Sequence, residues 1–60
     1  MKATINNATI KIWFSNLATC RNIPNVVEIE HNGNLMKVTD NKNNVILINF
    51  SNVNMVEEVK

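Results

Sequence analysis

The dipeptide Asn32-Gly33 lies between two runs of strand-forming residues, a pattern typical of a tight β-hairpin. A two-residue type I′ turn requires a positive φ at both central positions, which asparagine and glycine adopt at low steric cost. Counting outward from this turn places Glu28 opposite Lys37, and such a cross-strand pair contributes roughly 0.2–1 kcal/mol. The same register gathers apolar side chains on the opposite face: Val27, Ile29, Met36 and Val38. The sequence therefore predicts a hairpin in this register.

Two further segments have the pattern of strands. Apolar and polar residues alternate over residues 8–14, which is the period of a half-buried strand. Residues 45–50 are almost all large and apolar, which is typical of a strand that is covered on both faces. The triplet Ala-Thr-Ile at residues 3–5 recurs at residues 8–10, but a hairpin between the two copies would set two lysines against each other. We therefore expect the first strand to be residues 8–14.

The connection after the predicted hairpin reads as a three-residue loop with Asn43 in the left-handed conformation. This loop sets Val38 opposite Ile46, so that the apolar face continues into the third strand. A two-residue loop would instead turn Leu47 toward that face. Residues 53–59 fit a final strand or a short helix, and their valines favour a strand.

A short helix is expected between the first strand and the hairpin. Ser15 offers an N-cap, residues 16–22 form the helix with Cys20 on its inner side, and Pro24 ends it. The predicted fold is thus mainly β, of the small α+β kind, with an antiparallel sheet of four to five strands and one short helix after the first strand. This succession resembles the topology of Sm-like and SH3-like small barrels, although no diagnostic residues match.

The length of the chain indicates one domain, residues 1–60, with marginal stability. One cysteine permits no intramolecular disulfide, and the cysteine and single histidine do not have the spacing of a zinc site. We therefore expect no metal or cofactor, and we predict a homodimer or higher oligomer that buries one sheet face against its copy. The predicted self-interface residues come from the apolar segment: Val45, Leu47 and Phe50.

The composition argues against two classes of partner. The net charge is +1, which gives no basic surface for nucleic acid, and no apolar run is long enough to span a membrane. A single thiol and the absence of a signal-peptide pattern indicate the cytoplasm. Asparagine occupies thirteen of the sixty positions, whereas glycine, proline and arginine occur once each. This bias indicates A/T-rich coding, as in a low-GC bacterium or the phage that infects it.

Trp13 is the strongest candidate for a binding residue because it points away from the apolar stripe of its own strand. Beside Lys11 it could be an interface hot spot or a platform for a stacked base, or it could be covered as part of the core or a self-interface. We predict a partner-binding set of Lys11, Trp13, Glu57 and Glu58. His31 is interpreted as a partly exposed residue at the hairpin turn, and Cys20 as a small buried apolar residue.

These features predict a small non-enzymatic binding protein that acts by protein–protein interaction, such as an accessory or inhibitor protein of a phage or mobile element. A small nucleic-acid-binding β-barrel and a self-assembling structural component of a virion are the alternatives. We expect a second copy and one other protein as partners, with no membrane and no catalytic residues.

Overall fold

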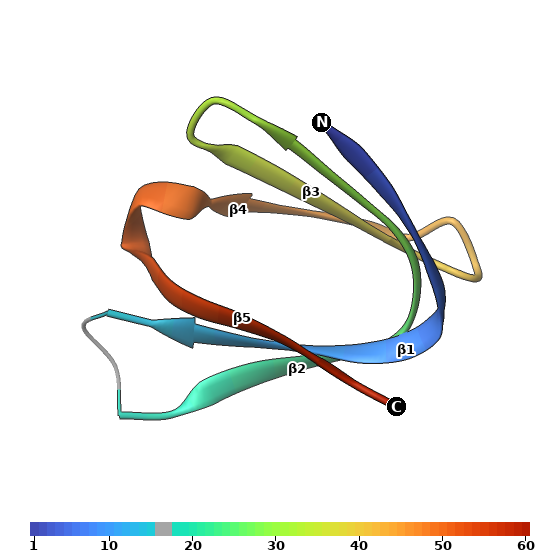
Figure 1. Cartoon of the computed structure of the whole chain (residues 1–60), viewed down its shortest axis with the longest axis horizontal. Helices are drawn as coiled ribbons and strands as arrows, with labels where there is room; N and C mark the ends of the chain where they lie inside the picture. The colour runs from blue at the N-terminus through green and yellow to red at the C-terminus, as the bar shows by residue number, and fades with distance from the viewer. Residues whose placement is uncertain (16–17) are drawn as a thin grey trace.

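The computed structural model describes residues 1–15 and 18–60, which form one strongly curved antiparallel sheet (Figure 1). The strands lie in the order β4-β3-β2-β1-β5, so that β4 and β5 are the two edges. The sheet comprises five strands and one 3-10 turn: β1 Lys2–Phe14, β2 Cys20–Asn32, β3 Leu35–Asp40, β4 Val45–Asn49, η1 Phe50–Asn52 and β5 Val53–Val59. The prediction of a mainly β protein with an antiparallel sheet is confirmed.

The two long strands β1 and β2 bend together near their middles, and this bend curls the sheet (Figure 1). Asn7 in β1 and Asn25 in β2 have φ angles of 51° and 58°, in the left-handed region that asparagine tolerates better than most residues. The register between the strands shifts on both sides of the pair Ala8 and Val26. Such β-bulges sharpen the local twist of a sheet. The repeated Ala-Thr-Ile triplet therefore lies within one bent strand and not in a hairpin.

The core lies on the concave inner face of the curved sheet. The alternation predicted over residues 8–14 is confirmed, since Ile10 and Ile12 are 1% and 0% exposed. Burying an isoleucine or valine side chain stabilises the fold by roughly 1.5–3 kcal/mol. All strands except β5 contribute to the set of buried apolar residues: Ala8, Ile10, Ile12, Ile23, Val26, Met36, Val38 and Ile48.

The predicted helix over residues 16–22 is wrong where the structure describes it. Residues 16 and 17 lie outside the described residues, and Cys20 to Asn22 open strand β2, where Cys20 pairs with Trp13 and Asn22 with Lys11. Two helical turns are marginal without packing, whereas residues 20–23 pair with β1 without a break. Pro24 falls between the pairs formed by its neighbours, in the bulge, where its missing N–H leaves no ladder bond unmade.

The hairpin between β2 and β3 forms, but its register differs from the predicted one. The turn residues are Gly33 and Asn34, and only Gly33 has a positive φ, 61°, which is the φ pattern of a type II′ turn. Glu30 pairs with Lys37, two positions from the predicted partner. Because the shift is an even number, Met36 still faces the core. A bulge after Val26 carries that residue inward in place of the predicted Val27.

The loop between β3 and β4 has the predicted length and conformation. Asn43 has a φ of 66°, and the backbone N–H of Asp40 donates to the carbonyl oxygen of Asn44 over 3.0 Å. The Asp40 carboxylate accepts from the side chain and backbone of Asn44 and from the Lys42 N–H at 2.9–3.0 Å. These bonds, with that from the Asn44 side chain foremost, hold the pKa of Asp40 below its ordinary 3.8. Val38 pairs with Ile46, as predicted.

Strand β4 lies at an edge of the sheet, whereas the sequence predicted a strand covered on both faces. Its inner side chain Ile48 is 6% exposed, but Val45 and Leu47 on the outer face are 50% and 60% exposed. Phe50 follows in the 3-10 turn and packs against the core. The structure describes a single chain, so the homodimer stays a prediction. Among residues 1–15 and 18–60 there is no helix with the length and apolarity needed to cross a bilayer.

Candidate functional site

Trp13 lies on the convex outer face of the sheet, at the centre of three adjacent strands. Its strand neighbour Ile12 is fully buried on the inner face, so the alternation of β1 turns Trp13 outward. Its Cα partners are Cys20 in β2 and Met55 in β5. Met55 is 48% exposed, whereas Trp13 and Cys20 are half-buried. We call Trp13, Cys20 and Met55 the Trp13 patch.

The indole N–H of Trp13 is enclosed, and it has no hydrogen-bond partner in the part of the chain that the structure describes. A buried tryptophan N–H usually finds an acceptor. Leaving a buried donor unsatisfied costs roughly 1–3 kcal/mol. Among the described residues, the side chain therefore lies on the convex face with this donor unpaired.

Charged side chains of both signs border the Trp13 patch. Lys11 is the residue of β1 that precedes Trp13 on the outer face, and its Cα partner is Glu57 of β5. Glu58 pairs with Ile10 and so belongs to the inner face of β5, with its carboxylate 3.8 Å from the Lys60 ammonium. The structure thus brings Lys11 and Glu57 beside Trp13 and places Glu58 on the other side of the sheet. The predicted binding role of these residues stays a prediction.

Sequence reasoning missed Cys20 and Met55 as neighbours of Trp13. Cys20 was expected on a helix, but it lies on β2, where its thiol donates to the Asn22 side chain over 4.0 Å. Met55 reaches the patch because β5 returns across the molecule to pair with β1 (Figure 1). No local signal in the sequence specifies that long-range pairing.

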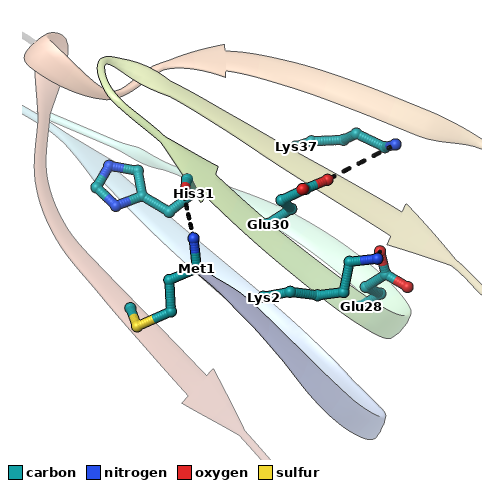
Figure 2. A network of polar contacts seen from close by, with 6 residues as sticks. All are labelled: Met1, Lys2, Glu28, Glu30, His31 and Lys37. Carbon is teal, nitrogen blue, oxygen red and sulfur yellow. Dashed lines mark hydrogen bonds and ion pairs between the residues drawn. The ribbon is translucent and has the colours of Figure 1, made fainter.

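A second group of polar contacts lies where the start of β1 pairs with β2, which pairs with β3 on its other side (Figure 2). The Lys2 ammonium is 3.7 Å from the Glu28 carboxylate, and the Lys37 ammonium is 4.0 Å from that of Glu30. These side chains are about a third to three-fifths exposed, so each pair contributes little to stability. Each of the two lysines also lies beside a carboxylate, which offsets much of the positive charge that an anionic ligand would meet.

His31 holds the start of β1 through its backbone. Its carbonyl oxygen accepts from the Met1 ammonium over 2.8 Å, and its N–H donates to the Met1 carbonyl oxygen over 2.7 Å (Figure 2). The His31 ring is half-buried, and its centroid lies 4.3 Å from that of Phe50. Its Nε2 is enclosed without a hydrogen-bond partner among the described residues. The ring therefore serves as packing at the end of the core.

Within the described residues, no three side chains of histidine, cysteine, aspartate or glutamate come together as metal ligands, and no cavity is found. The features that remain for recognition are therefore surfaces: the Trp13 patch and the edges of the sheet. Comparison of the chain with protein-family models, with curated proteins and with solved structures finds no match.

Proposed function

We propose that this protein is a binding module whose Trp13 patch recognises the surface of another protein. The observation that carries this proposal is an outward tryptophan beside an exposed methionine on adjacent strands. Tryptophan is the side chain most enriched at interface hot spots, and methionine adapts its shape to varied partners. The indole N–H supports the same conclusion, because it has no hydrogen-bond partner among the described residues and could donate to an acceptor on the partner.

The borders of the patch suggest the chemistry of the partner. Lys11 and Glu57 place one cation and one anion side by side next to Trp13. A surface with an apolar centre and a rim of both charges complements this arrangement. A nucleic acid does not, because its affinity comes from several cations that act together on phosphates, and here Glu57 offsets Lys11.

Trp13 is the only tryptophan of the chain, so its fluorescence reports directly on the patch. The first step is affinity capture from a low-GC bacterial lysate with the native chain and with Trp13→Ala. Leu35→Ala serves as the matched control, since Leu35 is an exposed apolar residue on β3, which is not an edge strand. The captured protein is then purified and titrated against each variant by isothermal titration calorimetry, because Trp13→Ala has no tryptophan. The emission of Trp13 is followed in addition for the native chain and the control variant.

We expect one protein to bind the native chain and the Leu35→Ala variant equally and the Trp13→Ala variant at least about tenfold more weakly, as for a hot-spot residue. Weaker binding of the same protein to the Met55→Ala variant would show that the binding site includes β5. Equal binding by Trp13→Ala would refute the proposal. Salt-dependent quenching of Trp13 by a single-stranded oligonucleotide would favour the nucleic-acid alternative instead.

We further propose that binding occludes the partner and so inhibits it, as an accessory protein of a phage or mobile element would in the cytoplasm of a low-GC host. The small size of the chain and its A/T-rich coding bias support this narrower proposal. The activity of the purified partner, measured with and without saturating native chain, tests it. If the activity of the partner is unchanged at full occupancy, the proposal of inhibition is refuted and the proposal of binding is not affected.

A further inference from the structure

The two edges of the sheet differ in how they are protected against pairing with another chain. Natural edge strands commonly carry charges, prolines or bulges that prevent such pairing. Strand β5 carries Glu57 and Glu58, and its register with β1 shifts at Trp13. Strand β4 is Val45–Asn49, which contains no charge and no proline, and its register with β3 is unbroken. The edge at β4 is therefore open to another strand, whereas the edge at β5 is not.

The hydrogen bonds at the two ends of β4 show which of its backbone groups are free. The carbonyl oxygen of Asn44 accepts from Asp40, and the N–H of Phe50 donates to Asn34, so both residues bond toward β3. In an antiparallel ladder the N–H and C=O of alternate residues point to opposite sides of the strand. The even-numbered residues of β4 therefore bond to β3, and Val45 and Leu47 direct both of their backbone groups to the open edge. Asn49 directs its N–H there, while its carbonyl oxygen, as that of the N-cap residue, also accepts the first bond of the 3-10 turn.

We propose that β4 pairs antiparallel with β4 of a second copy, about a twofold axis that passes beside Leu47. In this register Leu47 lies opposite its own equivalent, and Val45 of one copy lies opposite Asn49 of the other. Leu47 then forms a hydrogen-bonded pair with its equivalent, and the Asn49 N–H donates to the Val45 carbonyl oxygen of the other copy. The Val45 N–H donates to the second lone pair of the Asn49 carbonyl oxygen, whose first accepts within the 3-10 turn. A shift of two positions leaves some of these groups unpaired, and a shift of one position opposes residues of the wrong parity.

The side chains of β4 are compatible with this pairing. On the outer face, the exposed Leu47 side chains of the two copies cover one another and each Val45 side chain lies opposite Asn49, while Ile46 and Ile48 join the two inner faces. The nearest charged neighbour is Lys37, the Cα partner of Leu47 in β3. The two copies of Lys37 would lie three strand spacings apart, roughly 14 Å, which is beyond the screening length at physiological salt.

A second copy fits this edge better than a foreign peptide, because the edge is complementary to itself. About a twofold axis, the first half of β4 in one copy pairs with the second half of β4 in the other copy. Strand β4 suits this arrangement because it is uncharged, uninterrupted and centred on Leu47. Pairing of β4 with β5 of a second copy is less favourable, since it brings Glu57 and Glu58 against apolar side chains. This dimer differs from the predicted packing of one sheet face on another, and it leaves the Trp13 patch accessible.

Disulfide trapping tests the register directly. In a Cys20→Ser background, Leu47→Cys places two thiols on opposed residues about 5.5 Å apart at Cα, within the range of a disulfide. Val45→Cys is the matched control, because its equivalents lie roughly 14 Å apart along the paired strands. With oxidised glutathione as oxidant, we expect a covalent dimer from Leu47→Cys and none from Val45→Cys. A mixture of Val45→Cys and Asn49→Cys chains should also give a covalent dimer.

The oligomeric state in solution completes the test. Light scattering at micromolar concentration should give twice the 6.8 kDa mass of the native chain, and Leu47→Lys should give the monomer mass with an unchanged far-UV spectrum. Met55→Lys, which adds the same charge at the other edge, should remain a dimer. A monomeric native chain would overturn the proposal, as would a dimer that survives Leu47→Lys or that does not cross-link through Leu47→Cys. Partner capture through Trp13 is unaffected by any of these outcomes.

Discussion

The bend of the sheet predicts a specific sensitivity at Asn25. This residue has a φ of 58°, and its side chain is exposed, so its conformation matters more than its contacts. An L-residue in the left-handed region is strained by roughly 1–2 kcal/mol, and a β-branched side chain lies at the upper end of that range. We therefore expect Asn25→Val to lower the free energy of unfolding by about 1–2 kcal/mol.

The size of the chain makes this loss easy to measure. A domain of 60 residues has a total stability of about 3–9 kcal/mol, so the substitution removes a large fraction of it. For so small a domain the melting temperature falls by up to about 8 °C per kcal/mol, which gives a decrease of about 8–16 °C. Thermal unfolding followed by circular dichroism at fixed protein concentration provides the measurement.

Two matched variants isolate the cause. Asn22→Val makes the same chemical change in the same strand, at an exposed position without a positive φ, and should alter stability by less than about 0.5 kcal/mol. Asn25→Gly keeps the required φ accessible and should stay close to the native chain. Equal melting temperatures for Asn25→Val and Asn22→Val would refute the reasoning, because they would show that the bend does not depend on the left-handed residue.

Three other experiments test the core, the loop and the hairpin register. Ile12→Ala removes a fully buried side chain and should cost about 2–5 kcal/mol in denaturant unfolding, whereas a loss below about 1 kcal/mol would contradict its place in the core. The folded state lowers the pKa of Asp40, so its carboxylate stabilises the fold at pH values above the ordinary 3.8 and loses this effect as the pH falls through the lowered value. The stability difference between the native chain and Asp40→Asn should therefore shrink on acidification, and a constant difference would exclude the proposed role of the Asn44 hydrogen bonds. A double-mutant cycle with Glu30→Gln and Lys37→Met should give a coupling energy of up to about 1 kcal/mol, larger than that of the same cycle with Glu28→Gln in place of Glu30→Gln. A larger coupling energy for Glu28 would instead support the register predicted from the sequence.

The Trp13 patch shows how far sequence reasoning reaches into a site. The alternation of β1 correctly places Trp13 and Lys11 on the face opposite the buried isoleucines, because the direction of a side chain along a strand is a local property. The neighbours from other strands were not predictable. Met55 depends on the return of β5 to β1, and Cys20 on a strand where a helix was expected.

Local chemistry was sufficient wherever a few adjacent residues determine the conformation. The alternation of residues 8–14 and the loop with Asn43 in the left-handed region both appear in the structure as predicted. In each, the choice of conformation depends on side-chain direction or backbone sterics within one turn or strand.

Only the tertiary structure decided the pairing and the position of the strands. Glu30 and not Glu28 pairs with Lys37, because β2 also pairs with β1 along its other side and the hairpin does not choose its register alone. The apolar strand β4 lies at an edge, with Leu47 exposed, because the order of strands depends on contacts between residues far apart in the chain. Pairing energies of this kind are shared across the whole sheet, so no single segment of the sequence carries enough information to specify them.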